Sequence, residues 1–277
     1  LMTDEQQQTA QDYERIIFKQ VPESNKVEVD PVTGVLNRSS AASKMNPYDL
    51  YALETALRLR QDLGGRVSVM TMGPAQAEAV IREAYAMGAD EGWLITDRRF
   101  GGADVLATSY TLSQGIRRAG PFDLILCGKQ TTDGDTAQVG SEISEALSLP
   151  AVAGVLRILS AEAEAITVEM DLTDKVETVR VSLPCLLSVE KDIAQPRLPS
   201  YVRKQAMKDA PIHRLTLSDM EDTDAAHYGL SGSPTQVQRI FPPESNHKQE
   251  KWTGTGPELA GRLFGLLKEQ KLWQGGR

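Results

Sequence analysis

Residues 128–140, with the sequence GKQTTDGDTAQVG, combine the residue types that hold a ligand through the backbone. They follow the apolar run FDLILC and lead into a helical pattern. Glycine lets a ligand approach the chain closely, and the free N–H groups of a helix's first turn attract an anionic or carbonyl-bearing group. We expect the N–H groups of Thr136–Val139 to face such a group, with Asp135 or Thr136 as N-cap and Gln138 completing a capping box. The alternative is an ordinary strand–turn–helix connection.

Other kinds of site fail on their spacing. A phosphate-binding GxxxxGK[ST] loop would need glycine in place of Asp123 and a hydroxyl residue in place of Gln130. A GxSxG nucleophile turn is absent, and no GxGxxG run follows a strand. The chain has three histidines, His213, His227 and His247, so the residues before them offer no imidazole for base catalysis or metal binding. We predict no catalytic side chain and no metal site, and a bound organic cofactor fits better.

Composition limits the class of protein. Of the 277 residues 40% are hydrophobic, which is enough to form a core in one large domain or two modest ones. The 30 basic and 38 acidic residues give a net charge of −8, which disfavours nucleic-acid binding. Cys127 and Cys185 lie in apolar runs and are expected to be reduced core thiols. No apolar run reaches the roughly 18 residues of a membrane span, and the polar N-terminus lacks a secretory signal, so we expect a cytoplasmic protein.

The elements that would position the loop alternate between strand and helix. Strands are predicted at residues 16–19, 67–72, 92–96 and 122–127, with a hairpin at 27–37. One helix opens at Asn46-Pro47 and ends at Gly64, a second ends at Gly88, and a third precedes the last of these strands. This order predicts an α/β fold with a doubly wound, mostly parallel, Rossmann-like sheet. Ligands of such sheets bind beyond the carboxyl ends of the strands.

The pattern changes after residue 150. Further strands are predicted at 152–156 and 186–189, with an added antiparallel hairpin formed by 165–171 and 176–183. Prolines interrupt residues 191–251, which we expect to form a tail or to wrap a partner. Pro257 opens a final helix whose apolar face suggests docking. We therefore predict an α/β domain at 15–190 and a C-terminal arm at 191–277.

Several spaced motifs together resemble the beta subunit of electron transfer flavoprotein. These are KQVPESNKVEVDPVTG, MNPYDLYALETALRLR, GPAQAEAVIREAYAMGAD, GKQTTDGDTAQVG, KDIAQPRLPSYVRKQAMKDAPI and GLSGSPTQV, and the likeness covers nearly all of residues 15–272. The resemblance implies a heterodimer with an alpha subunit that holds an FAD, and an adenine nucleotide in the α/β domain of the chain itself. It also implies that the 191–277 arm embraces the alpha subunit.

The resemblance also implies the members of the nucleotide pocket. They are Ile17 on the first strand, Asn46 before the first long helix, Met72 ahead of Gly-Pro, and the loop residues Gly128, Lys129, Gln130, Thr131, Thr132, Asp133, Gly134, Asp135, Thr136, Ala137, Gln138 and Val139. Ile17 and Met72 have a core position as the alternative, Asn46 a helix cap, and Lys129 a solvated charge. The family carries a partner-docking anchor after Pro196-Arg197, and a gap-free alignment puts Tyr201 there.

The sequence DGDTAQVG at 133–140 resembles that of electron-bifurcating members, which hold FAD at this site, whereas ordinary members bind AMP there. The smaller, uncharged Gly134 would leave room for a larger anionic cofactor, and Val139 would offer an apolar wall. The resemblance implies an FAD that accepts a hydride from NADH and splits its electrons between ferredoxin and, through the alpha-subunit FAD, an acyl-CoA-type dehydrogenase. The alternatives are a non-bifurcating electron carrier subunit that binds AMP, and a stand-alone nucleotide-binding module.

Overall fold

The computed structural model describes residues 13–18, 20–22, 43–236 and 250–272. The chain divides into two compact units, with the boundary between residues 238 and 239. The hairpin predicted at 27–37 lies outside the described residues. Among the residues that are described, no helix has the length and apolar character needed to cross a membrane.

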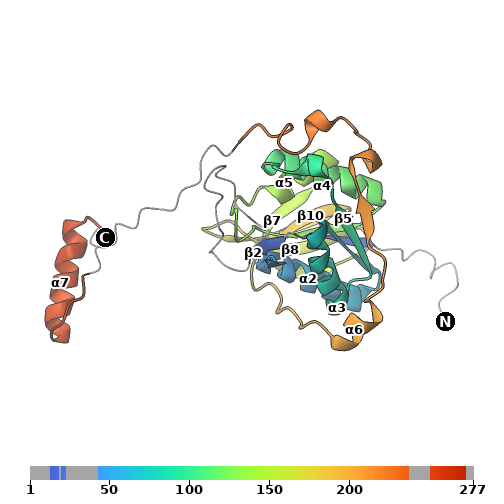
Figure 1. Cartoon of the computed structure of the whole chain (residues 1–277). Helices are drawn as coiled ribbons and strands as arrows, with labels where there is room; N and C mark the ends of the chain where they lie inside the picture. Colours follow the sequence, from blue (N-terminus) through green and yellow to red (C-terminus); the bar gives the residue numbers. More distant parts are fainter. Residues whose placement is uncertain (1–12, 19, 23–42, 237–249, 273–277) are drawn as a thin grey trace. The chain divides into compact units, whose positions relative to one another are not determined.

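A sheet forms the centre of the first unit (Figure 1). It has nine strands in the order β11-β5-β4-β1-β6-β10-β7-β8-β9. Its strands are β1 (Tyr13–Phe18), β4 (Arg66–Met72), β5 (Glu91–Ile95), β6 (Leu124–Gly128), β7 (Ala151–Ala161), β8 (Ala165–Asp171), β9 (Val176–Ser182), β10 (Cys185–Val189) and β11 (His213–Leu215). Neighbours from β11 to β7 run parallel, and β8 and β9 are antiparallel. A short ribbon pairs β2 (Gln20–Pro22) with β3 (Ser43–Met45). The Rossmann-like α/β fold with an added hairpin is confirmed.

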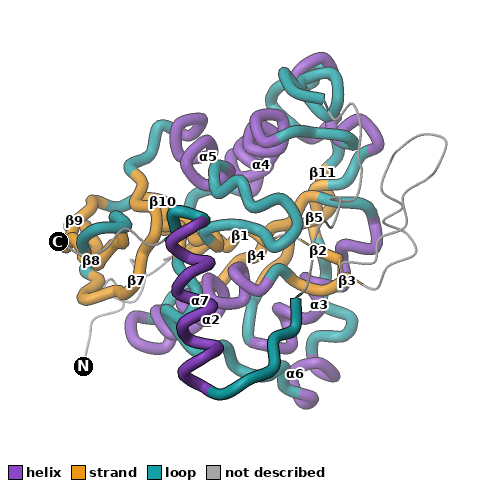
Figure 2. The backbone as a smooth tube through the Cα atoms, turned by 90° about the vertical axis from the view of Figure 1, so that its left-hand side faces the viewer, coloured by secondary structure: helices purple, strands orange, loops and turns teal. Residues whose placement is uncertain are grey.

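Helices cover both faces of the sheet. In Figure 2, α4 (Val105–Ala119) and α5 (Val139–Leu147) lie on one side, with α2 (Pro47–Leu63) and α3 (Glu78–Met87) on the other. Strand β6 alternates between the two cores, because Leu124 and Leu126 pack toward α2 and α3 while Ile125 and Cys127 pack toward α4 and α5. All four residues are buried, which confirms a strand covered on both faces.

The chain reverses direction in the sheet between β1 and β6. From β1 it moves outward to β4 and then β5, and it returns across β1 to form β6 on the other side. Such a reversal leaves a crevice at the carboxyl ends of the two strands, because their outgoing connections run to opposite faces. The loop that follows β6 therefore begins at the place where ligands of open α/β sheets bind.

Residues 191–236 contain more regular structure than their prolines predict. Helix α6 (Tyr201–Ala206) packs against α3, and β11 pairs with β5 to extend the sheet. Arg203 fixes α6, since its guanidinium donates to the carbonyls of Tyr85, Gly88 and Ala89 at the end of α3. The interpretation of this stretch as irregular is wrong for these residues, because tertiary contacts stabilise elements too short to show a periodic pattern.

The second unit is represented by residues 250–272 and contains α7 (Gly256–Glu269). Thr255 and Glu258 form a capping box at its start, which agrees with the predicted opening near Pro257. Leu263, Phe264 and Leu266 are each more than two-fifths exposed. The apolar face of the helix is therefore not covered within the part of this unit that the structure describes.

Candidate functional site

The carboxyl ends of three neighbouring strands meet at the crevice. Met72 ends β4, Gly128 ends β6, and Ile17 is the last residue but one of β1. In the sheet register the backbone of Ile17 lies between Met70 and Cys127. Met72 is half-buried and packs against the core under α4. The structure thus brings these predicted site residues to one edge of the sheet, and their contact with a ligand stays a prediction.

Asn46 connects the start of α2 to the loop after β6. Its side chain is fully buried and makes no capping hydrogen bond to its own helix. Instead Nδ2 donates to the carbonyl of Gln130 over 2.9 Å, and Oδ1 accepts from the N–H of Thr132 over 3.3 Å. Asn46 thus occupies the predicted N-cap position of α2, but its side chain does not cap the helix. Asn46 uses both ends of its amide to hold the loop in place.

Asp49, one turn along α2, holds the base of the same loop. Its Oδ1 accepts from the N–H of Gly128 at 3.2 Å, and its side chain is almost fully buried. A Cβ atom at position 128 would lie 2.6 Å from the backbone carbon of Tyr48. Only glycine allows β6 and α2 to approach this closely, so Gly128 is required for packing.

The loop itself is open to solvent. Residues 132–138 are all exposed. The turn at residues 131–135 is closed by a hydrogen bond from the Asp135 N–H to the carbonyl of Thr131. Asp135 and Ala137 have positive φ angles of 51° and 55°. Helix α5 therefore begins at Val139, and its N-cap residue Gln138 makes no side-chain cap. The predicted capping box is wrong, because left-handed residues at 135 and 137 interrupt a helix that would start there.

The same backbone geometry suits an anion. Ala137 is left-handed and Gln138 is right-handed, with φ −105° and ψ −27°. Alternation of this kind directs successive N–H groups into one concavity, and the start of α5 adds the favourable end of its dipole. The loop therefore presents backbone donors where a phosphate or carbonyl group could bind.

Lys129 does not extend freely into solvent. Its Nζ forms an ion pair with Oε1 of Glu190, the first residue after β10. The hydrogen bond that Nζ donates to Glu190 raises the pKa of Lys129. The Lys129 side chain is 37% exposed, so its charge is partly solvated as well as paired with Glu190.

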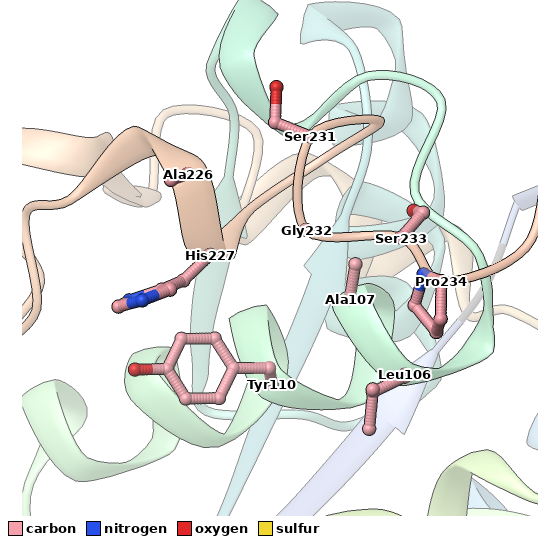
Figure 3. A pocket seen from close by; sticks show the side chains of 9 residues that line it. All are labelled: Leu106, Ala107, Tyr110, Ala226, His227, Ser231, Gly232, Ser233 and Pro234. Carbon is pink, nitrogen blue, oxygen red and sulfur yellow. The ribbon is translucent and has the colours of Figure 1, made fainter.

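A pocket of about 620 Å³ lies between α4 and residues 226–234, and Tyr110 and His227 are among the residues that line it (Figure 3). Asp222 Oδ2 accepts from the Tyr110 hydroxyl at 2.6 Å and lies 2.5 Å from His227 Nδ1. The hydrogen bond from Tyr110, with those of Asp224 and His227, lowers the pKa of Asp222 to about 2. The same contact raises the pKa of His227.

This pocket has the residue types of a nucleophilic site without the geometry. In Figure 3 the Ser231 side chain points away from His227. The Ser233 hydroxyl donates to the carbonyl of Gly229 at 2.7 Å and accepts from the N–H of Asp104. Neither serine hydroxyl lining the pocket is thus placed to give its proton to the imidazole. Within the described ranges 13–18, 20–22, 43–236 and 250–272, no three metal-binding side chains gather either.

Tyr201 lies far from the loop. It is the first residue of α6 and is 75% exposed. Since α6 packs at the end of α3 that leads into β5, it lies near the amino edge of the sheet, opposite the crevice. Nearby Leu198 is 88% exposed. The structure therefore separates the predicted docking residue from the other predicted site residues.

Buried Glu54 fixes the segment that leads to this surface. It accepts from the backbone N–H and the guanidinium of Arg197, and from Arg58. Burial by itself would raise the pKa of Glu54, but the hydrogen bonds from the two arginines outweigh burial and lower it. These hydrogen bonds hold Arg197 against α2, so the segment that begins at residue 198 starts from a fixed position.

Fold and site together define a Rossmann-like α/β protein with a backbone-donor loop at its switch point. The electron transfer flavoprotein domain model matches residues 33–220. The chain belongs to the electron transfer flavoprotein family.

Curated relatives match over most of their length. The chain is 44% identical over 261 residues to the "Caffeyl-CoA reductase-Etf complex subunit CarD" of Acetobacterium woodii, covering 93% of this chain and 98% of that protein. It is 43% identical to an "Electron transfer flavoprotein subunit beta" of Thermoanaerobacterium thermosaccharolyticum, over 92% and 97% of the two chains. It is 40% identical to "Protein FixA" of Bradyrhizobium diazoefficiens, over 91% and 90%.

Two residues at the site were not predicted. Asp49 contacts the loop from one turn beyond Asn46, and Glu190 meets Lys129 from the end of β10. Asp49 lies three residues after Asn46 and therefore on the same face of the helix, and this spacing could have predicted its contact with the loop. Glu190 had no such signal, since its position depends on the order of the strands.

Proposed function

We propose that this chain is the beta-type subunit of an electron-bifurcating electron transfer flavoprotein. In this proposal Ile17, Asn46, Met72 and residues 128–139 bind FAD. The observation that carries it is the exposed loop at the switch point, whose backbone alternates between left- and right-handed residues. The 44% identity to a subunit of a caffeyl-CoA reductase-Etf complex supports the bifurcating assignment.

The residues present fit an anionic dinucleotide. The N–H groups of Thr136–Val139 would bind phosphate oxygens, while Asn46 and Asp49 hold the loop in the conformation that presents them. Half-buried Val139 packs against the core and would offer an apolar wall to a ring. When bound, FAD would supply the redox chemistry, taking a hydride from NADH and passing one electron to ferredoxin and one, through the alpha-subunit FAD, to an acyl-CoA-type dehydrogenase.

The chain's own side chains would act by binding and orientation. Cys127, directly before the loop, is fully buried, and burial raises its pKa to about 12, so it stays a neutral thiol. The His227–Asp222 pair lies at the separate pocket beside α4. We therefore assign no catalytic acid or base to this subunit.

The proposal includes partners. The exposed apolar residues Leu263, Phe264 and Leu266 of α7 suit a surface that is buried against an alpha subunit. Tyr201 and Leu198 suit docking of the dehydrogenase, because they are exposed on a segment that Glu54 holds rigid. We take the complex to act in the cytoplasm.

Identifying the bound ligand tests this proposal. The full chain is co-expressed with its alpha subunit, the subunits are separated, and the ligand released from this chain by denaturation is analysed by absorbance and mass spectrometry. We expect FAD. Release of AMP alone would overturn bifurcation and support the non-bifurcating carrier. Release of no adenine nucleotide would overturn the site as well.

A variant of the loop sharpens the test. Gly134→Asp introduces bulk and charge on the exposed loop, and we expect it to lose FAD at least tenfold more than AMP. Gly256→Asp is the matched control, since it adds the same group where a side chain meets open space. Equal FAD content in the two variants would contradict a role for Gly134 in selecting the cofactor.

A further inference from the structure

Lys129 and Glu190 occupy equivalent places on neighbouring strands. Gly128 and Val189 are register partners at the ends of β6 and β10, and Lys129 N–H donates to the carbonyl of Val189 at 2.9 Å. Each charged residue is therefore the first one past its strand. Register partners on parallel strands point to the same side, which is why the two side chains meet at the crevice.

Glu190 is the more rigid member of this pair. Its backbone N–H donates to the carbonyl of Val155 at 2.9 Å, which fixes the chain on the side away from Lys129. The Glu190 side chain is 13% exposed, against 37% for Lys129. The carboxylate is thus a fixed, nearly buried charge, and the ammonium group comes to it from the loop.

Because Lys129 is paired with Glu190, residues 128–140 carry no uncompensated positive charge. Lys129 is the one basic residue among residues 128–140, which also contain Asp133 and Asp135. Asp171, at the end of β8, adds a further negative charge close enough to affect Lys129. A ligand phosphate approaching this loop would therefore meet backbone N–H groups and a neutralised lysine.

We propose that Glu190 is a specificity-determining residue of the nucleotide site, which compensates Lys129 so that phosphate is recognised by backbone donors and not by free positive charge. The inference rests on the proposed function, because it assumes that the loop binds a nucleotide. Its consequence is that the site gains little from additional phosphate charge. The site would then select a ligand by the shape of the groups other than its phosphates. Discrimination between AMP and FAD, which both contain adenine, requires this kind of selection.

Removing the carboxylate charge should reveal this compensation. Glu190→Gln keeps the size of the side chain and a hydrogen-bond acceptor for Lys129, and adds one net positive charge beside the loop. Coulomb attraction over a partly screened distance then predicts binding of AMP roughly three- to tenfold tighter at low salt, and a larger gain for ADP. Adenosine, which has no charge, should bind as before.

The experiment uses the full chain, freed of bound ligand and titrated with adenosine, AMP and ADP at two salt concentrations. Asp192→Asn is the matched control, because it removes the charge of a carboxylate two residues further on, which accepts a hydrogen bond from the Tyr51 hydroxyl. Lys129→Gln should weaken AMP binding, and the double variant should return toward wild type. Thermal denaturation of each variant verifies that it is folded.

The outcomes separate two failures. A charge-graded, salt-sensitive gain in Glu190→Gln alone supports the inference. If wild type binds AMP but Glu190→Gln equals Asp192→Asn, or binds AMP more weakly, Glu190 does not compensate Lys129 for the ligand and the inference is overturned while the site stands. If wild type binds none of the three ligands, the proposed function fails and the inference fails with it.

Discussion

Removal of the Asn46 side chain is expected to release the loop after β6 while leaving the sheet folded. Two hydrogen bonds are lost, of 2.9 Å to Gln130 and 3.3 Å to Thr132. The shorter bond contributes about 1 kcal/mol net and the longer one somewhat less, and burial adds the cost of the space left behind. We expect Asn46→Ala to lower the free energy of unfolding by about 2 kcal/mol, or the melting temperature by roughly 4–8 °C.

Urea denaturation of the ligand-free full chain measures this loss. Gln76→Ala is the control, because it removes a similar amide from an exposed position and should change the stability by less than about 0.5 kcal/mol. Asn46→Asp adds a second readout. Its carboxylate would face the Gln130 carbonyl, so the loss relative to wild type should be larger at neutral pH than at a pH where the acid is protonated and can donate.

The reasoning is refuted if ligand-free Asn46→Ala is as stable as Gln76→Ala. In that case other contacts hold the loop. A variant of unchanged stability that nevertheless loses nucleotide would make Asn46 a direct ligand contact and not a positioning residue.

Three further changes test the packing and the charges. Gly128→Ala should lower the free energy of unfolding by about 2–3 kcal/mol, because its Cβ would meet backbone at 2.6 Å. Gly265→Ala, which faces open space inside a helix, should raise it by up to about 1 kcal/mol. Denaturant titration of the two variants measures both changes. Glu54→Gln should cost about 1–3 kcal/mol at pH 7, and since the folded pKa of Glu54 is lowered, this difference from wild type should shrink as pH falls below 4.5. His227→Gln removes a group whose folded pKa is raised by Asp222. Wild type should therefore be more stable than the variant below pH 6.5 and should lose that advantage as pH rises through the folded pKa. A constant difference in melting temperature across this pH range would contradict the prediction.

The regular elements could be predicted where one local signal was strong. The burial of β6 on both faces and the Pro47 start of α2 follow from a continuous apolar run and from proline's fixed φ. The start of α5 could not be predicted the same way. Asp135 is a good N-cap by residue type, but its left-handed backbone is set by the turn that closes on Thr131.

The sequence places the candidate site residues at one edge of the sheet but does not indicate the contacts between them. Asn46 is predicted to belong to the site, yet its partners Gln130 and Thr132 lie more than 80 positions along the chain. The ion pair of Lys129 with Glu190 requires β10 to lie beside β6, and nothing local indicates that order. Long-range pairing is decided by the packing of whole elements, which single-sequence patterns do not encode.

The position of β10 has a consequence for how the chain becomes active during synthesis. β10 lies between β6 and β7, both of which precede it in the chain. A polypeptide made only as far as Leu183 possesses those two strands without the one that separates them. Any direct pairing of β6 with β7 in that interval must be undone before β10 can insert. The ion pair of Glu190 with Lys129 cannot form before β10 takes its place between the two strands.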